Sequence, residues 1–134
     1  MAVEILKEKC IGCGQCDKGC YTGAKITCGK EYTAGELLTE ILRDKPYYGE
    51  KGGVTFSGGE PLLQPEFLLE ALKLCKENEI HTCLDTAGCG NGDYEEILKY
   101  TDLVLFDVKH YTKEGYKLVT GCEQDESLRF LDAL

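Results

Sequence analysis

Four cysteines near the start of the chain are spaced as ligands of a metal cluster. The chain holds nine cysteines, an odd number, and four of them fall within eleven residues in the pattern C-x2-C-x2-C-x3-C. Four thiolates at this spacing can surround a single metal cluster, whereas a disulfide joins two cysteines whose Cα atoms lie roughly 4.4 to 6.8 Å apart. We predict a [4Fe-4S] cluster that relays electrons, with structural zinc as the less favoured alternative. The candidate ligands are Cys10, Cys13, Cys16 and Cys20.

The spacing leaves the fourth ligand of this cluster open. In paired ferredoxin runs the fourth cysteine ligates the other cluster. Cys20, Cys28 and a ligand from outside the chain are therefore all candidates for this position. Cys75 and Cys83 lie in apolar segments, and we expect them to be small buried residues rather than ligands.

A second set of polar residues follows three short apolar runs farther along the chain. These residues are Ser57 and Glu60, Asp85 and Thr86, and Asp107 and Lys109. In parallel α/β architectures, ligands sit at the carboxyl ends of the strands, so we expect the three pairs to share one rim and one ligand. The alternative is that Asp85 and Asp107 only cap the helices that follow.

The elements that must position these residues alternate between strand and helix patterns. Thr33 to Glu36 has capping-box spacing, and an apolar stripe follows it as far as Pro46. This pattern predicts a helix that ends before the proline. Residues 54–56 form a β-prone run that stops at a glycine turn. Pro65 suits the first position of a second helix, which is expected to end near Asn78.

The same pattern then recurs. Residues 80–84 and 103–106 are predicted strands, with a glycine-rich loop and a short helix about Ile97 between them. The unit is therefore βαβαβ, and such crossovers imply a parallel sheet. Composition changes near residue 31, so we predict a cysteine-rich segment over residues 1–31 and an α/β region over residues 32–134.

Composition bounds the class of protein. With 134 residues and 43% hydrophobic composition, the chain suits one core with an appendage. Its net charge of −9 and the lack of a dense Lys/Arg run argue against nucleic acid as a partner. No stretch approaches the roughly eighteen apolar residues of a membrane span, and the first ten residues lack the apolar core of a secretory signal. We expect a cytoplasmic protein.

Three segments together resemble a known family. They are the block Gly53-Val-Thr-Phe-Ser-Gly-Gly-Glu-Pro-Leu-Leu-Gln-Pro65, the run Asp85-Thr-Ala-Gly88 and the run Asp107-Val-Lys109. The chain is similar over almost its whole length to the activating enzymes of glycyl radical enzymes, which are radical S-adenosylmethionine (SAM) proteins. The resemblance implies an α/β fold that is part of a parallel (β/α) TIM barrel, with an N-terminal ferredoxin-like iron–sulfur insert.

The resemblance also assigns roles to the predicted rim. Gly58, Gly59 and Glu60 would bind the methionyl amino group of SAM, with Ser57 beside them. A carboxylate is a natural acceptor for an ammonium group, and glycines permit close backbone approach. By the same resemblance, Lys109 would contact the cofactor, and a monovalent cation would lie near the cofactor carboxylate, which suits hard oxygen ligands. The cation ligands would be Asp85, Thr86 and Asp107.

The implied activity is reductive cleavage of SAM to a 5′-deoxyadenosyl radical, which abstracts a glycine hydrogen from a partner glycyl radical enzyme. A flavodoxin or ferredoxin-type protein would be the reductant. The family's C-x3-C-x2-C motif, which anchors the catalytic cluster, is absent from the sequence. We therefore expect an internal piece of an activase that is inactive alone and has no catalytic residue of its own. A ferredoxin-like electron carrier and a zinc-stabilised binding module are the alternatives.

Overall fold

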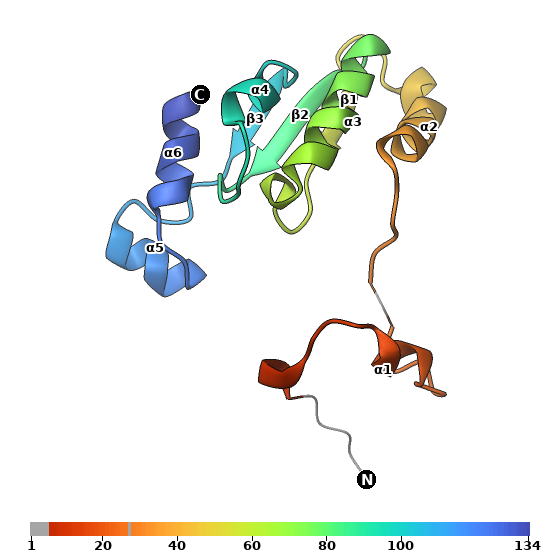
Figure 1. Cartoon of the computed structure of the whole chain (residues 1–134). Helices are drawn as coiled ribbons and strands as arrows, with labels where there is room; N and C mark the ends of the chain where they lie inside the picture. The colour runs from red at the N-terminus through yellow and green to blue at the C-terminus, as the bar shows by residue number, and fades with distance from the viewer. Residues whose placement is uncertain (1–5, 27) are drawn as a thin grey trace. The chain divides into compact units, whose positions relative to one another are not determined.

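A computed structural model describes residues 6–26 and 28–134 of the chain (Figure 1). The chain divides into two compact units, Met1–Glu31 and Tyr32–Leu134. The identity of the first unit as a ferredoxin-like insert stays a prediction.

The first unit consists mostly of turns. Its helical turns are η1 (Lys7–Lys9) and α1 (Gln15–Lys18), and α1 has no buried residue. Gly12 and Gly14 both have a φ of 69°, a left-handed conformation that residues other than glycine rarely adopt. These glycines stand on either side of Cys13, so the backbone is left-handed directly before and after this cysteine.

The second unit is built on a parallel three-stranded sheet, as the sequence predicts. Its strands are β1 (Gly53–Phe56), β2 (His81–Thr86) and β3 (Leu103–Phe106), in the order β1-β2-β3. Helix α3 (Pro65–Glu77) connects β1 to β2, and α4 (Tyr94–Leu98) connects β2 to β3. The βαβαβ prediction is confirmed, and the unit is compatible with part of a (β/α) fold.

The predicted first helix of this unit is also present, as α2 (Ala34–Asp44). The Thr33 hydroxyl accepts from the amide of Glu36, whose side chain accepts in turn from the Thr33 amide at 2.8 Å. This is the capping box that the sequence predicts. Pro46 lies in the 3-10 turn η2 (Lys45–Tyr47) that follows, where the α-helix has ended.

Side chains from the sheet and its helices form two apolar clusters. The larger one is made of Leu62, Leu68, Leu72, Leu84, Tyr94, Ile97 and Phe130. The smaller one joins α2, the end of α3 and the residue before β2 through Ile41, Cys75 and Ile80. Cys75 and Cys83 are buried as expected, and burial raises the pKa of Cys75 to about 11. These clusters hold the helices against the strands and leave the strand ends clear for polar residues.

Two helices at the end of the chain are absent from the sequence-based prediction. Helix α5 (Lys113–Thr120) and helix α6 (Asp125–Ala133) follow β3, and a 3-10 turn, η3 (Pro61–Leu63), follows the glycine turn after β1. Signals for α5 exist in the sequence. Thr112 caps its first turn by accepting from Gly115, and Gly121 ends it with a φ of 76°. Over the described part of the chain, no helix is long and apolar enough to cross a membrane.

Candidate functional site

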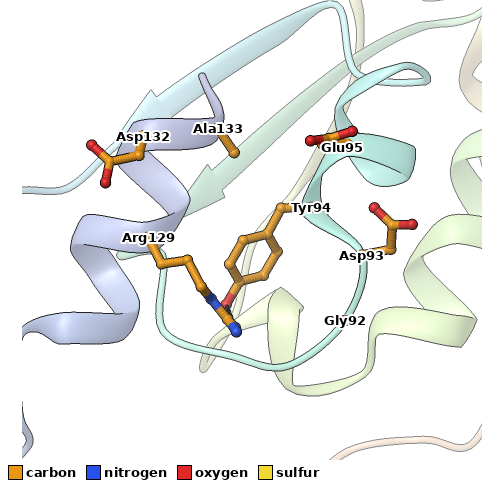
Figure 2. Close-up of a pocket in the computed structure, with 7 residues that line it drawn as sticks. All are labelled: Gly92, Asp93, Tyr94, Glu95, Arg129, Asp132 and Ala133. Atoms are coloured by element: carbon orange, nitrogen blue, oxygen red, sulfur yellow. Dashed lines mark hydrogen bonds between the residues drawn. The ribbon is translucent and has the colours of Figure 1, made fainter.

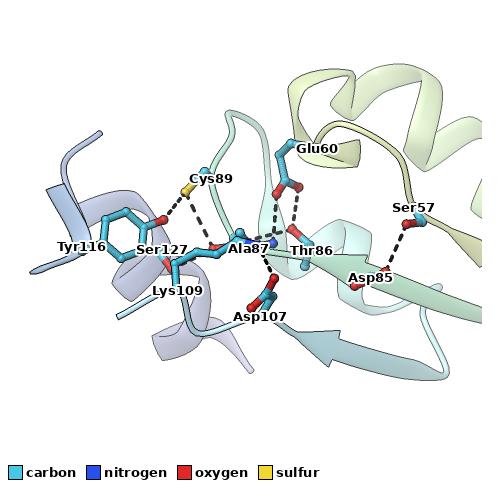
Figure 3. A network of polar contacts seen from close by, with 11 residues as sticks. Ser57, Glu60, Asp85, Thr86, Ala87, Cys89, Asp107, Lys109, Tyr116 and Ser127 are labelled. Carbon is cyan, nitrogen blue, oxygen red and sulfur yellow. Dashed lines mark hydrogen bonds and ion pairs between the residues drawn. The ribbon is translucent and has the colours of Figure 1, made fainter. Parts of the chain in front are cut away.

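The carboxyl ends of the three strands open onto one polar cleft of about 140 Å³. All of the rim residues predicted from the sequence line this cleft. Figure 3 shows six of them, Ser57, Glu60, Asp85, Thr86, Asp107 and Lys109. Parallel pairing explains this arrangement, because Thr86 ends β2 opposite Phe106 and the amide of Asp107 donates to the Thr86 carbonyl at 2.9 Å. The lining residues are Ser57, Gly58, Gly59, Glu60, Asp85, Thr86, Ala87, Asp107 and Lys109.

Glu60 connects the loop after β1 to the end of β2. Its Oε1 accepts from the amide of Leu62 at 3.1 Å and from the hydroxyl of Thr86 at 2.5 Å. Its Oε2 accepts from the amide of Ala87 at 3.0 Å. A carboxylate offers about four acceptor positions, so three internal donors leave one for a ligand. Glu60 therefore orders the rim itself, a role that the sequence analysis does not assign to it.

The other charged groups of the cleft are also paired with one another. The hydroxyl of Ser57 donates to Oδ2 of Asp85 at 3.0 Å, which joins the ends of β1 and β2. The ammonium of Lys109 forms an ion pair with the carboxylate of Asp107. That pair raises the pKa of Lys109, to which the charges of Asp85 and Glu60 also contribute. Lys109 is the cation that faces three carboxylates in this cleft.

The alternative role for the two aspartates, helix capping, is wrong. Helix α4 is capped by Asp93, whose Oδ1 accepts from the amide of Glu96 at 3.0 Å. Helix α5 is capped by Thr112. Asp85 and Asp107 instead line the cleft, where Asp85 accepts from Ser57 and Asp107 pairs with Lys109.

The two glycines of the rim have open space where a side chain would stand. Gly58 has a φ of 124°, which a side chain would make unfavourable, and a Cβ there would meet no heavy atom within 4 Å. A Cβ at Gly59 would likewise meet nothing within 4 Å. Open space beside exposed backbone is what close approach of a ligand requires.

Behind the cleft lies a second layer of polar contacts, which the sequence analysis misses. Oγ of Ser127 donates to the carbonyl of Ala87 at 2.7 Å, and the Cys89 sulfur lies 2.8 Å from the Tyr116 hydroxyl oxygen (Figure 3). Burial raises the pKa of Tyr116 to about 12, so its phenol stays protonated at neutral pH. No signal in the sequence marks these residues, since their partners lie 27 and 40 positions away.

A larger cleft, of about 350 Å³, lies beside α4 and α6 (Figure 2). The cation of this cleft is Arg129, whose guanidinium carbon lies 4.7 Å from the centroid of the Tyr94 ring. The guanidinium also donates to the Tyr94 hydroxyl at 3.0 Å and to the Gly90 carbonyl at 3.3 Å. Arg129 is thus engaged with protein groups, and the other charged residues around it are acidic. Its chemistry suits packing better than ligand binding, so the strand-end cleft is the stronger candidate site.

The cysteine run lies in the first unit. Cys10, Cys13 and Cys16 are exposed, and Cys20 is half-buried. Within residues 6–26 and 28–134, no three His, Cys, Asp or Glu side chains gather closely enough to hold a metal ion. The Thr22 hydroxyl and neighbouring backbone amides lower the pKa of Cys20, which favours the thiolate form that binds metals. The ligand set of the cysteine run stays a prediction.

Comparison with known proteins places this geometry in context. The sequence profile described as the Radical SAM superfamily matches residues 8–134. The chain is 67% identical over 94 residues to "Pyruvate formate-lyase-activating enzyme" of Clostridium pasteurianum, covering 69% of this chain and 40% of the relative. It is 41% identical over 135 residues to "4-hydroxyphenylacetate decarboxylase activating enzyme" of Clostridium scatologenes, covering 98% of this chain and 43% of the relative.

A third relative comes from a different genus. The chain is 46% identical over 109 residues to "Pyruvate formate-lyase-activating enzyme" of Staphylococcus aureus (strain USA300), covering 75% of this chain and 43% of the relative. The chain thus spans less than half of the length of these curated relatives.

Proposed function

This chain belongs to the radical SAM superfamily, and we propose that it carries the cofactor-binding rim of a glycyl radical enzyme activating enzyme. One observation supports this proposal most strongly. Acidic, hydroxyl and cationic groups from three adjacent strand ends converge on a single cleft. The names of its relatives support the same assignment.

The charged groups of this cleft fit the amino-acid part of SAM. The ligand would present an ammonium and a carboxylate, and the cleft offers carboxylate oxygens for the first and an ammonium for the second. Glu60 and the open backbone at Gly58 and Gly59 would receive the ammonium group, with Ser57 beside them. The cofactor carboxylate would take Lys109 as its partner.

Binding would rearrange the ion pair between Lys109 and Asp107. Both side chains are about half exposed, at 41% and 53%, and exposed ion pairs contribute little to stability. Transfer of Lys109 to the cofactor carboxylate therefore costs little. It would leave Asp107, with Asp85 and Thr86, as hard oxygen ligands for a monovalent cation beside that carboxylate.

The first unit would hold an auxiliary [4Fe-4S] cluster. Its donors are of the right kind, since thiolates hold iron–sulfur clusters and four cysteines lie within eleven residues. Cys10, Cys13, Cys16 and Cys20 would bind it, with Cys28 or an outside group as the substitute for Cys20. Such a cluster supplies one electron at a time when bound. The residues of the second unit would bind and orient SAM.

The activity proposed for the whole protein is activation of a glycyl radical enzyme. SAM would be cleaved by one electron to methionine and a 5′-deoxyadenosyl radical, which would take one hydrogen atom from a glycine of the partner and leave a glycyl radical. The electron would come from a flavodoxin or ferredoxin-type protein in the cytoplasm. The motif C-x3-C-x2-C does not occur in these 134 residues, so the chain by itself would cleave no SAM.

Anaerobic reconstitution with iron and sulfide, followed by titration with SAM, tests this function against the two alternatives. The proposal predicts a brown protein that binds SAM and loses that binding in Asp85→Asn. A brown protein that binds no SAM would instead indicate a ferredoxin-like electron carrier. A colourless protein with one equivalent of zinc would indicate a zinc-stabilised module and contradict the iron–sulfur assignment.

A further inference from the structure

We propose that helices α5 and α6 form a positioning clamp for the candidate rim, with Ser127, Gln124 and Tyr116 as its positioning residues. The functional side of this inference rests on the proposed function of the rim. None of the three residues lines the strand-end cleft. Each of them makes a polar contact with a segment that directly follows a strand.

The first arm of the clamp holds the segment after β2. Ser127 is 4% exposed and donates to the carbonyl of Ala87 at 2.7 Å. The amide of the same Ala87 donates to Glu60 at 3.0 Å. The backbone polar groups of Ala87 are therefore held from both sides, by the loop after β1 and by α6 (Figure 3). A buried hydroxyl needs a partner, and this one takes a rim carbonyl.

Packing around Gly88 strengthens this arm. A Cβ at Gly88 would lie 2.8 Å from Cε2 of Phe106 and 3.0 Å from Cβ of Phe130, so α6 rests directly on the loop. Phe130 is fully buried and stacks on Phe106 with ring centroids 5.8 Å apart. Because this contact is close-packed, a shift of α6 would displace the loop that follows Thr86.

The second arm comes from α5. Tyr116 is 1% exposed, and its hydroxyl oxygen lies 2.8 Å from the Cys89 sulfur. The protonated phenol is thus available as a hydrogen-bond partner at the base of the same loop. Ser127 and Tyr116 together hold the loop at two points, two residues apart in sequence.

The third arm holds the segment after β3. Gln124 is 7% exposed and donates from Nε2 to the carbonyl of His110 at 2.8 Å, one residue beyond Lys109. Nδ1 of His110 accepts from the amide of Thr112 at 3.1 Å, and its ring lies against Gly115, where a Cβ would come within 2.0 Å. The segment that carries Asp107 and Lys109 is thereby fixed at the start of α5.

The rim residues and the clamp residues therefore have different roles. The rim residues would touch the cofactor, while the buried polar groups of α5 and α6 set the positions of the segments that follow β2 and β3. The described part of the chain has four buried polar residues, Thr82, Thr86, Gln124 and Ser127, and both of those contributed by the α5–α6 region contact rim loops. These contacts serve the rim more directly than they serve the packing of the two helices.

Amide hydrogen exchange measured by NMR tests the clamp without any cofactor. The reporters are rim amides that donate to rim acceptors, at Ala87, Gly88 and Asp107. Amides within α3 report global unfolding. We expect Ser127→Ala to speed exchange at Ala87 and Gly88 by about tenfold, and Gln124→Met to do the same at Asp107, with little change in α3.

Thr82→Val is the matched control. Thr82 is also fully buried, but it contacts Asp102 and Tyr100 at the opposite ends of the strands. The Thr82→Val substitution should speed amide exchange in α3 and in the rim to the same extent. Rim exchange in both clamp variants that is unchanged, or that only follows α3, would overturn the proposal.

Titration with SAM separates this inference from the proposed function. If the unchanged chain binds SAM, the two clamp variants should bind about tenfold more weakly. If both clamp variants bind SAM as tightly as the unchanged chain and rim amide exchange is unchanged, the clamp proposal is contradicted and the proposed function is not. If rim amides exchange faster in the clamp variants but the unchanged chain binds no SAM, the clamp proposal is supported and the proposed function is contradicted.

Discussion

The hydroxyl of Thr86 donates to Oε1 of Glu60 at 2.5 Å, which ties the end of β2 to the turn after β1 across 26 residues. The same carboxylate also accepts from two backbone amides, those of Leu62 and Ala87. Charge-assisted hydrogen bonds of this kind are stronger than neutral ones. Glu60 is therefore both a candidate ligand contact and a structural bracket of the site.

Glu60→Gln tests the bracket. The amide group of glutamine places a donor where Glu60 has an acceptor, so the backbone amide of either Leu62 or Ala87 must lose its partner. We expect unfolding free energy to fall by about 1 to 3 kcal/mol, measured by urea denaturation. Glu66→Gln, which changes an exposed carboxylate at the start of α3, is the control. Equal stability of the two variants would show that the bracket contributes nothing.

Two glycine substitutions separate ligand space from packing space. Gly59→Ala places a methyl group in open space at the cleft, so we expect stability to change by less than about 0.5 kcal/mol while SAM binding weakens. Gly88→Ala drives a methyl group against two phenylalanines at a φ of 73°, and should cost about 1 to 3 kcal/mol. Urea denaturation and SAM titration measure both effects. Unimpaired SAM binding by Gly59→Ala would contradict close cofactor approach at the glycine turn.

Glu79→Gly should stabilise the chain. Helix α3 ends in a Schellman motif, with the amide of Ile80 donating to Cys75 at 2.9 Å and the amide of Glu79 donating to Lys76 at 3.0 Å. Glu79 holds the left-handed position of this motif at a φ of 54°, where glycine is favoured. The expected gain is about 1 kcal/mol in thermal or urea denaturation. Glu70→Gly within α3 should cost a similar amount, and a loss in both variants would contradict the assignment.

The carboxylate of Asp102 should make stability depend on pH. Burial raises its pKa, but hydrogen bonds from Lys76 and from the amide and hydroxyl of Thr82 lower it more, so the pKa lies below its usual 3.8. A lowered folded-state pKa gives stabilisation that is present above pH 3.8 and lost as the pH falls through the folded value. Asp102→Asn should be less stable at neutral pH, with a deficit that narrows below pH 3.8.

The control for this pH dependence is Asp132→Asn, which removes an exposed carboxylate on α6. Urea denaturation at several pH values measures the unfolding free energy of both variants. A deficit of Asp102→Asn that stays constant between neutral and strongly acidic pH would contradict the linkage.

Local patterns made much of this fold predictable. The capping box at Thr33 and Glu36, the proline at the start of α3 and the β-prone runs each act within a few residues, so the sequence displays them directly. Helix α6 escapes prediction because Gln124 does not cap it with its side chain. Gln124 and Ser127 are polar but buried, and their partners lie 14 and 40 residues away. Periodicity cannot reveal contacts of that range.

The same distinction applies to the site. Polar residues that follow strands were enough to predict a shared rim, since parallel strands end at one edge of a sheet. That both oxygens of Glu60 are engaged by Leu62, Thr86 and Ala87 depends on the path of the loops, which the sequence pattern does not specify.

The central claim is that the strand-end cleft recognises the amino-acid part of SAM, and NMR titration of the chain tests it most directly. SAM and methionine should shift the amides of residues 57–60, 85–88 and 107–109 with roughly millimolar dissociation constants, while adenosine should not. Asp85→Asn should abolish these shifts and Asp132→Asn should preserve them. Shifts centred on Arg129, or shifts at the rim that survive Asp85→Asn, would contradict the account.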